Sequence, residues 1–170
     1  MVDLRFLFIP ITALFFVRLE LPMTYKIRVL KVYDGDTLLI KFGPFKERLR
    51  LFLIDAPELS QPDGVGEYAK KCLVRVLHEQ KELILIVGFR DVYGRLLGNL
   101  KGVTERLIQE GCTGFYPYAQ FSSAAEKMFY LRLQKEAREK KNGLWGIGGY
   151  RQPSLWRKTK KQNGRQRPRR

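Results

Sequence analysis

Residues 34–58, DGDTLLIKFGPFKERLRLFLIDAPE, hold the pattern that decides the fold of this chain. Two apolar runs, 38–42 and 47–54, stand on either side of a Gly-Pro break and are predicted to be strands. The turn DGDT precedes the first run; its glycine supplies backbone freedom, and its aspartates can bond nearby backbone amides. The second run ends at DAPE, because proline has no N–H with which to continue a strand ladder. Each strand therefore has acidic residues beside one end.

These acidic ends meet if the two strands belong to one sheet. Asp36, Asp55 and Glu58 would then converge on one site, with Arg50 a few residues away on the second strand. Carboxylates gathered in one place repel one another unless a cation joins them. Oxygen ligands favour calcium or magnesium. Zinc is not expected, because the chain offers only one histidine and two cysteines that are far apart in the sequence. The alternative is that each aspartate only forms a turn or caps a strand end.

Two further motifs complete an ordered set. DVYGRLL stands at 91–97 and GLW at 143–145, after DGDT and the R-x-x-x-x-D-x-P-E pattern that begins at Arg50. In order and spacing this set resembles the staphylococcal nuclease (thermonuclease) family, and the likeness covers about residues 26–145. The resemblance implies an α+β fold, a five-stranded OB-fold barrel with about three helices. We divide the chain into an apolar segment at 1–22, the nuclease-like domain at 23–150 and a basic tail at 151–170.

The resemblance also implies which residues hold calcium. Side chains of Asp36 and Asp55 would bind the ion, and Ala56 would add its backbone carbonyl. Threonine stands in place of Ala56 in the best-known member of the family, so a carbonyl ligand is kept while any role of a hydroxyl is lost. Hard oxygen ligands of this kind suit calcium.

Catalytic roles follow from the chemistry of phosphodiester hydrolysis. Negative charge grows on the phosphate oxygens in the transition state, so cationic groups must be placed there. The guanidinium forks of Arg50 and Arg95 match phosphate geometry, and Glu58 can orient or deprotonate the attacking water. By resemblance, Tyr93, Tyr116 and Tyr118 fall near positions that face the nucleotide, where rings stack on bases without reading sequence. We expect Phe115 beside them to pack in the core.

Enzymes of this family are calcium-dependent and cleave DNA and RNA with little sequence preference, leaving 3′-phosphate and 5′-hydroxyl ends. The expected substrate is single-stranded or locally melted nucleic acid, and no obligate protein partner is evident. The alternative is a non-catalytic OB module that binds nucleic acid or protein. The full set of acidic and arginine residues favours the enzyme, because a pure binding module has no use for carboxylates that face phosphates.

Periodicity predicts the remaining elements. Strands are expected at 25–33, which pairs with 38–42 through the DGDT turn, and at 83–89 and 96–100. A helical face recurs at Ala69, Cys72, Leu73, Val76 and Leu77. A short helix from about Thr104 ends at Gly111, and a capping box at Ser123 opens a helix that runs to Lys141. Cys72 and Cys112 are expected to be buried apolar groups, and a disulfide between them is the alternative for an exported protein.

Both ends of the chain differ in composition from the domain. An apolar run at 6–17 is too short to span a bilayer and fits a secretory or membrane-tethering segment, in which case it contacts the membrane. The alternatives are a start at Met23, which would leave a cytoplasmic protein, and an extra buried element. Of the 32 Lys and Arg residues, nine lie in 151–170, where there is no acid, and the net charge is +15. This excess favours a polyanionic partner, and from Arg157 onward we expect no regular structure.

Overall fold

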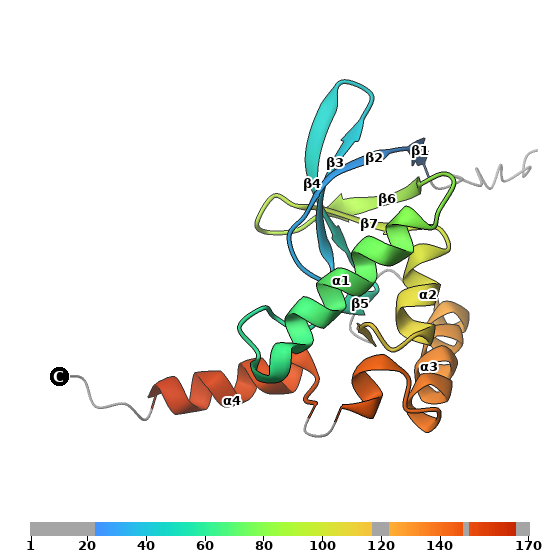
Figure 1. The fold of residues 1–170 in the computed structure, drawn as a ribbon. Helices are drawn as coiled ribbons and strands as arrows, with labels where there is room; N and C mark the ends of the chain where they lie inside the picture. The colour runs from blue at the N-terminus through green and yellow to red at the C-terminus, as the bar shows by residue number, and fades with distance from the viewer. Residues whose placement is uncertain (1–22, 117–122, 148–149, 166–170) are drawn as a thin grey trace, which may run out of the picture.

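The chain folds as an α+β domain in a computed structural model that describes residues 23–116, 123–147 and 150–165 (Figure 1). The predicted α+β class is confirmed. In chain order, the described elements are β1 (Thr24–Lys26), β2 (Arg28–Val32), β3 (Thr37–Phe42), β4 (Phe45–Leu51), β5 (Ile54–Asp55), η1 (Pro62–Gly64), α1 (Val65–His78), β6 (Ile84–Arg90), β7 (Leu96–Leu100), α2 (Val103–Gln109), β8 (Gly114–Phe115), α3 (Ala124–Glu139), η2 (Gly143–Gly146) and α4 (Pro153–Arg165).

Six strands form one sheet in the order β1-β6-β7-β4-β3-β2, and β5 pairs separately with β8. Every neighbouring pair in the larger sheet is antiparallel except β4 and β7, which run parallel. β1 and β2 occupy opposite edges of this sheet, although only Ile27 separates them along the chain. The sheet must therefore curl until its edges approach, as in an OB-type barrel. The bend at Ile27 splits the strand predicted at 25–33, so the sheet contains one strand more than predicted.

The strand register brings the predicted site residues together. Thr37 of β3 lies opposite Arg50 of β4, and the Leu51 amide donates to the Asp36 carbonyl at 2.9 Å. The run predicted as one strand at 47–54 ends at Leu51, and the chain resumes as β5, where Asp55 pairs with Gly114 of β8. The two acidic ends predicted to meet in one sheet thus meet where β3, β4 and β5 approach one another.

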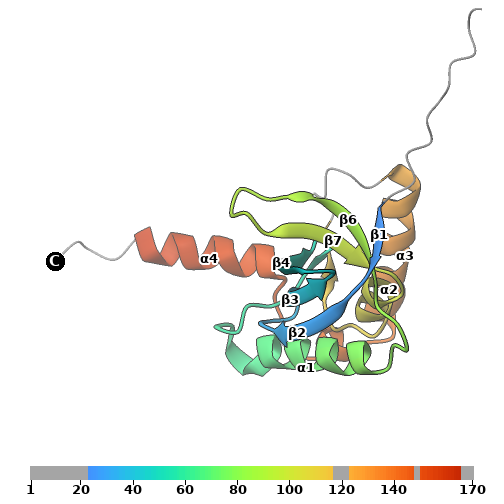
Figure 2. The same cartoon turned by 90° about the horizontal axis from the view of Figure 1, so that it is seen from above.

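Helix α1 runs along one face of the curled sheet, while α2 and α3 pack beside its end (Figures 1 and 2). All five residues of the predicted helical face are buried, which confirms that face. Cys72 on α1 is joined to Cys112 by a disulfide, and both cysteines are buried. The core is built mainly from leucines of the sheet and apolar residues of α1 and α2, among them Leu38, Ile40, Leu49, Leu51, Leu73, Val76, Leu85, Leu100, Leu107 and Ile108.

The predicted helix ends are confirmed for two helices. The hydroxyl of Ser123 caps α3 by accepting from the Glu126 amide at 3.1 Å. Gly111 follows the last residues of α2 with φ of 69°, a conformation that favours glycine at this position. The long helix predicted to reach Lys141 ends slightly earlier, at Glu139.

The prediction of no regular structure from Arg157 onward is wrong for residues 157–165, which belong to helix α4 (Pro153–Arg165). Proline suits the first position of a helix, because its fixed φ is already helical and its missing N–H would have no partner there. The sequence hid this helix because Leu155 and Trp156 are almost the only apolar residues in a strongly basic segment. Within the described parts of the chain, every helix is too short or too polar for a membrane-spanning segment. The apolar run predicted to contact a membrane, residues 6–17, lies outside the described residues.

Candidate active site

One cavity of about 560 Å³ gathers the predicted site residues. It opens where β3, β4 and β5 meet the turn before β7. Of the nine predicted residues, eight line this cavity: Asp36, Arg50, Asp55, Ala56, Glu58, Tyr93, Arg95 and Tyr116. The ninth, Tyr118, lies outside the described residues. Residues that are up to 80 positions apart in sequence thus share one hollow.

The turn that begins this site is held by Asp34. Its carboxylate accepts from the backbone amides of Asp36 at 3.0 Å and Thr37 at 2.7 Å, as the sequence predicted. Backbone freedom, the reason predicted for a glycine at position 35, is wrong, because the φ of Gly35 is not in the left-handed region. A Cβ at this position would lie 2.6 Å from the Ala56 Cβ and 2.8 Å from the Ala69 Cβ. Gly35 therefore lets the turn approach α1 and the strand end that carries Asp55.

Asp36 is 5% exposed, and each of its carboxylate oxygens has at least one partner. Its Oδ2 accepts from Arg50 Nη1 at 2.5 Å and from the Ala56 amide at 3.2 Å, while Oδ1 accepts from the Thr37 hydroxyl at 2.9 Å. The guanidinium of Arg50 thus sits against the aspartate that was predicted to hold a metal. Asp36 and Asp55 in turn raise the pKa of Arg50, although burial acts in the opposite direction.

Asp55 is less well satisfied than Asp36. Arg157 Nη2 donates to its Oδ2 at 2.7 Å, whereas Arg50 Nη2 approaches Oδ1 only to 3.6 Å. Oδ1 is buried and has no hydrogen-bond partner. Burial raises the pKa of Asp55 above its ordinary value, and the two arginines offset this only in part. A buried carboxylate oxygen without a donor is a favourable place for a cation.

Glu58 lies farther out than the sequence predicted. The side-chain oxygens of Asp36, Asp55 and Glu58 do not all lie within 4.8 Å of one another, so these carboxylates share a cavity but not one tight cluster. The reason is local, because Glu58 follows β5 in a turn: its amide donates to Gln61 Oε1 at 3.0 Å. Its Oε1 lies 3.7 Å from Arg157 Nη1, and the side chain is 36% exposed. Glu58 is thus open to water, which suits the role predicted for it.

Asp91 builds the turn that presents Arg95. Its Oδ1 accepts from the amides of Tyr93 at 2.9 Å and Arg95 at 3.0 Å, and its Oδ2 accepts from Arg95 Nε at 2.7 Å. Gly94 has φ of 76°, so a glycine suits the tip of this turn. Burial acts to raise the pKa of Asp91, but the bonds from Arg95 and the amides hold it below its ordinary value. The motif D-x-Y-G-R is therefore one folded unit that aims a guanidinium at the cavity.

Aromatic side chains form the rest of the cavity wall. Tyr93 is 81% exposed, and the Arg95 guanidinium lies 5.5 Å from its ring centroid. Tyr116 lines the same cavity, where its amide donates to the Leu53 carbonyl at 2.9 Å. Phe115 is buried and stacks on Tyr130, which confirms the core role predicted for it. Rings at the mouth of an arginine-lined cavity can stack on nucleotide bases.

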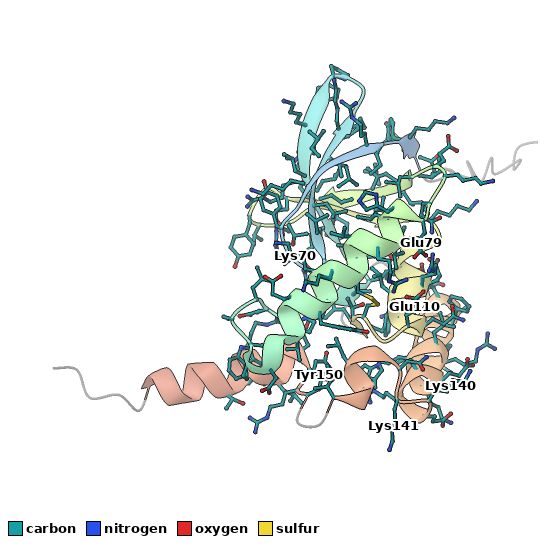
Figure 3. All side chains as sticks on the ribbon, viewed as in Figure 1. Lys70, Glu79, Glu110, Lys140, Lys141 and Tyr150 are labelled. Atoms are coloured by element: carbon teal, nitrogen blue, oxygen red, sulfur yellow. A yellow bond between two sulfur atoms is a disulfide. The ribbon has the colours of Figure 1, made fainter. Side chains whose placement is uncertain are left out.

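Sequence reasoning missed two residues beside Asp55. Arg157 stands 102 positions away in the segment predicted to be irregular, so no spacing rule could connect it to the site. Tyr150, labelled in Figure 3 near the start of α4, is half-buried, and its hydroxyl is buried without a hydrogen-bond partner. Burial and the nearby Asp55 both raise the pKa of Tyr150 above its ordinary value. Its position just after the GLW motif was the only available signal.

Comparison with known proteins points to one family. Residues 48–146 match the family model described as staphylococcal nuclease homologue. The chain is 33% identical over 141 residues to an uncharacterized endonuclease of Haemophilus influenzae, covering 80% of this chain and 75% of that protein. It is 31% identical over 138 residues to an uncharacterized endonuclease of Escherichia coli O157:H7, with coverages of 78% and 85%. It is 30% identical over 146 residues to a micrococcal nuclease of Shigella flexneri, with coverages of 78% and 80%.

Proposed function

Since the chain belongs to the family of staphylococcal nuclease homologues, and is thereby a nuclease that hydrolyses phosphodiester bonds, we propose that it is calcium-dependent. We further propose that it cleaves single-stranded or locally melted DNA and RNA with little sequence preference, to 3′-phosphate and 5′-hydroxyl ends. The observation that carries this proposal is the cavity in which Arg50 bridges two buried aspartates, one of which keeps an unpartnered oxygen.

The residues present fit a hard divalent cation. The donors available are the carboxylates of Asp36 and Asp55 and the backbone carbonyl of Ala56, all of them oxygens. Oδ1 of Asp55 is buried without a hydrogen bond, which a cation would satisfy. Calcium accepts carboxylate, carbonyl and water oxygens in flexible geometry, and magnesium demands a stricter octahedron. When bound, calcium would supply positive charge to the phosphate and a place for the attacking water.

The side chains of the cavity divide the rest of the chemistry among them. Arg50 and Arg95 bind the phosphate and stabilise the negative charge that grows on its oxygens. Glu58, the most accessible carboxylate of the predicted set, orients the attacking water and accepts its proton. Tyr93 and Tyr116 stack on the adjoining bases, which holds the strand without reading its sequence.

The proposal is tested by digestion of a single-stranded oligodeoxynucleotide and an RNA of the same sequence. We expect cleavage of both in millimolar calcium, little in magnesium and none in chelator, with labelled products that carry 3′-phosphates. Undiminished hydrolysis in chelator would contradict calcium dependence. Binding of both oligonucleotides with no cleavage in calcium, in magnesium or in chelator would favour the alternative of a non-catalytic OB module.

One variant tests the assignment of the metal ligand. Asp36→Asn should weaken calcium binding at least tenfold while the fold is retained, because it removes the charge of a proposed ligand. Asp63→Asn is the matched control, since Asp63 is exposed in η1 outside the cavity. Calcium binding is measured by calorimetry and folding by circular dichroism. If Asp36→Asn is unfolded, Asp36 is structural instead.

A further inference from the structure

Helix α4 delivers a guanidinium to the carboxylates of the active site. Arg157 Nη2 lies 2.7 Å from Asp55 Oδ2, and Nη1 lies 3.7 Å from Glu58 Oε1. The start of α4 is anchored nearby, because Gln61 Nε2 donates to the Arg151 carbonyl at 3.2 Å. Gln61 also accepts from the Glu58 amide, so one glutamine ties α4 to the turn that carries the proposed general base. Figure 1 shows α4 leaving the domain from beneath α1.

Two arginines therefore flank Asp55, one on each carboxylate oxygen, and they are held very differently. Arg50 projects from a central strand, is 20% exposed and bonds Asp36 at 2.5 Å. Arg157 projects from a helix at the edge of the domain and is 44% exposed. A long, half-exposed side chain can turn into solvent or onto another anion, and its departure leaves the buried carboxylate of Asp55 in need of another cation. Of the two arginines, Arg157 is the one free to leave.

We propose that Arg157 competes with the divalent cation for Asp55, and that a phosphate of the substrate releases it. The inference rests on the proposed function, because it presumes that Asp55 is a ligand of that cation. A guanidinium bonded to Asp55 at 2.7 Å occupies one of the oxygens that a metal would need. Its charge would also repel a divalent cation placed in the same cavity. Oδ1 stays open to the cation while Arg157 holds Oδ2, so the competition is chiefly one of charge, and the cation binds most tightly once Arg157 has turned away from Asp55.

A bound phosphodiester gives Arg157 a second partner. The side chain lines the same cavity as Arg50 and Arg95, the two arginines assigned to the phosphate. Once it contacts that phosphate, Asp55 is left open to the cation, and the charge of Arg157 is neutralised by the substrate. Substrate should then raise the affinity for the cation, and by linkage the cation should raise the affinity for substrate by the same factor. The site would fill with metal chiefly when nucleic acid is present.

Calcium titrations of the full chain without substrate test the competition. Wild type, Arg157→Ala, Arg157→Lys and Lys158→Ala are titrated with calcium chloride in a calorimeter. We expect Arg157→Ala to bind calcium about tenfold more tightly than wild type, because one competing charge is gone. Arg157→Lys should fall between the two. Lys158→Ala removes the same charge one residue away, where the described structure has no ion pair, and should leave the affinity within about twofold.

The coupling is tested by repeating the titrations with a nuclease-resistant phosphorothioate dinucleotide. Wild type should gain calcium affinity when the dinucleotide is present, and Arg157→Ala should gain less, since its site is already open. Equal calcium affinities of Arg157→Ala and Lys158→Ala would overturn the competition. An undiminished gain in Arg157→Ala would overturn the role of the phosphate. Circular dichroism checks that each variant folds. If Arg157→Ala is unfolded, the comparison of Arg157→Lys with wild type still tests the competition.

Nuclease assays distinguish a failure of the proposed competition by Arg157 from a failure of the proposed calcium-dependent nuclease activity. If wild type cleaves DNA with calcium but Arg157→Ala binds calcium no more tightly, the competition is wrong and the proposed function stands. If Arg157→Ala binds calcium more tightly but no variant cleaves nucleic acid, the competition is supported and the calcium-dependent nuclease is not. Absence of calcium binding in every variant would overturn both the competition and the proposed cofactor.

Discussion

Two clusters of arginine and carboxylate residues in this molecule differ in how completely their charges are paired. The first is the candidate active site, where Arg50 and Arg157 flank Asp55. The second lies at the ends of α1 and α2, where Glu79 and Glu110 are labelled in Figure 3, and we call it the surface ring. Its members are Arg75, Glu79, Arg106 and Glu110. Each arginine of the ring pairs with both glutamates, with distances that include 3.3 Å for Arg75–Glu79 and 2.8 Å for Arg106–Glu110.

The carboxyl pKa values that shift do so in opposite directions in the two clusters. In the surface ring, bonds from Arg106 and Arg75 lower the pKa of Glu79, and despite partial burial the same arginines lower that of Glu110. In the active site, burial raises the pKa of Asp34 and of Asp55, although Arg157 sits on the latter. The ring is thus satisfied by the protein alone. The site is not, and this unmet demand for positive charge distinguishes a site that binds from one that only stabilises.

The largest effect should come from Glu58→Gln. The substitution keeps the size and hydrogen bonding of the side chain but removes the basic oxygen, so kcat should fall by about 10² or more. Affinity for a nucleotide should stay near that of wild type, because the role proposed for Glu58 is felt only as the transition state forms. Glu67→Gln, on the exposed side of α1, is the matched control. Full activity of Glu58→Gln would remove this residue from the mechanism.

A smaller loss is expected from Arg95→Lys. The charge is kept but the planar fork is lost, along with the bond from Nε to Asp91 that aims it, so kcat should fall on the order of tenfold. Steady-state kinetics on a single-stranded substrate measure this, with Arg132→Lys on the exposed side of α3 as control. If Arg95→Lys matches wild type, charge alone suffices at this position and the fork has no special role.

Asp55→Asn should stabilise the protein in chelator. A raised pKa means that the native state favours the protonated carboxyl. That contribution to stability is fully present below the ordinary value of 3.8 and is lost as pH rises through the raised pKa. Asparagine resembles the protonated form at every pH, so the melting temperature at pH 7 should rise by about 2 to 4 °C, with little difference near pH 4. Thermal melts across this range measure the effect.

The control for Asp55→Asn is a substitution that should change the melting temperature in the opposite direction. The pKa of Asp91 is held low, so its stabilising contribution is present above the ordinary value of 3.8 and is lost as pH falls through the lowered pKa. Asp91→Asn should therefore lower the melting temperature at pH 7 and approach wild type in acid. Added calcium should stabilise wild type and Asp91→Asn but not Asp55→Asn, which lacks a ligand. Equal responses of all three would show that Asp55 does not hold the cation.

Local sequence patterns predicted most of the helices and strands, while the OB-type arrangement and the proposed ligands came from the family that the motifs resemble. The helical face of α1 and the cap at Ser123 depend on neighbouring residues, so periodicity and spacing were enough to find them. The Gly-Pro break at 43–44 was also visible in the sequence, and this two-residue turn between β3 and β4 sets Thr37 opposite Arg50. The motif D-x-Y-G-R could also be recognised in the sequence, because a single turn contains both Asp91 and Arg95.

The features that sequence reasoning missed depend on contacts between distant segments. The bend at Ile27 arises because β1 pairs with β6 while β2 pairs with β3, and no local signal marks that division. Gly35 is required by the approach of Ala56 and Ala69, which only the folded chain brings near. Arg157 reaches Asp55 through a helix whose composition resembles that of a solvated tail. Each of these three features is determined by packing between segments that are far apart in the sequence.

The smallest effect should come from breaking the surface ring. Glu79→Gln leaves Arg75 and Arg106 paired with Glu110, and all four side chains are in contact with water, so little is lost. The melting temperature should fall by no more than about 2 °C, and the loss should vanish in high salt because exposed charges are screened. Activity and calcium affinity should not change.

Glu139→Gln, in an exposed and longer pair with Lys135, is the control for removing one surface charge. A loss of several degrees, or altered calcium affinity, would show that the ring is coupled to the cavity through α1 and the disulfide, and the contrast between the two clusters would fail.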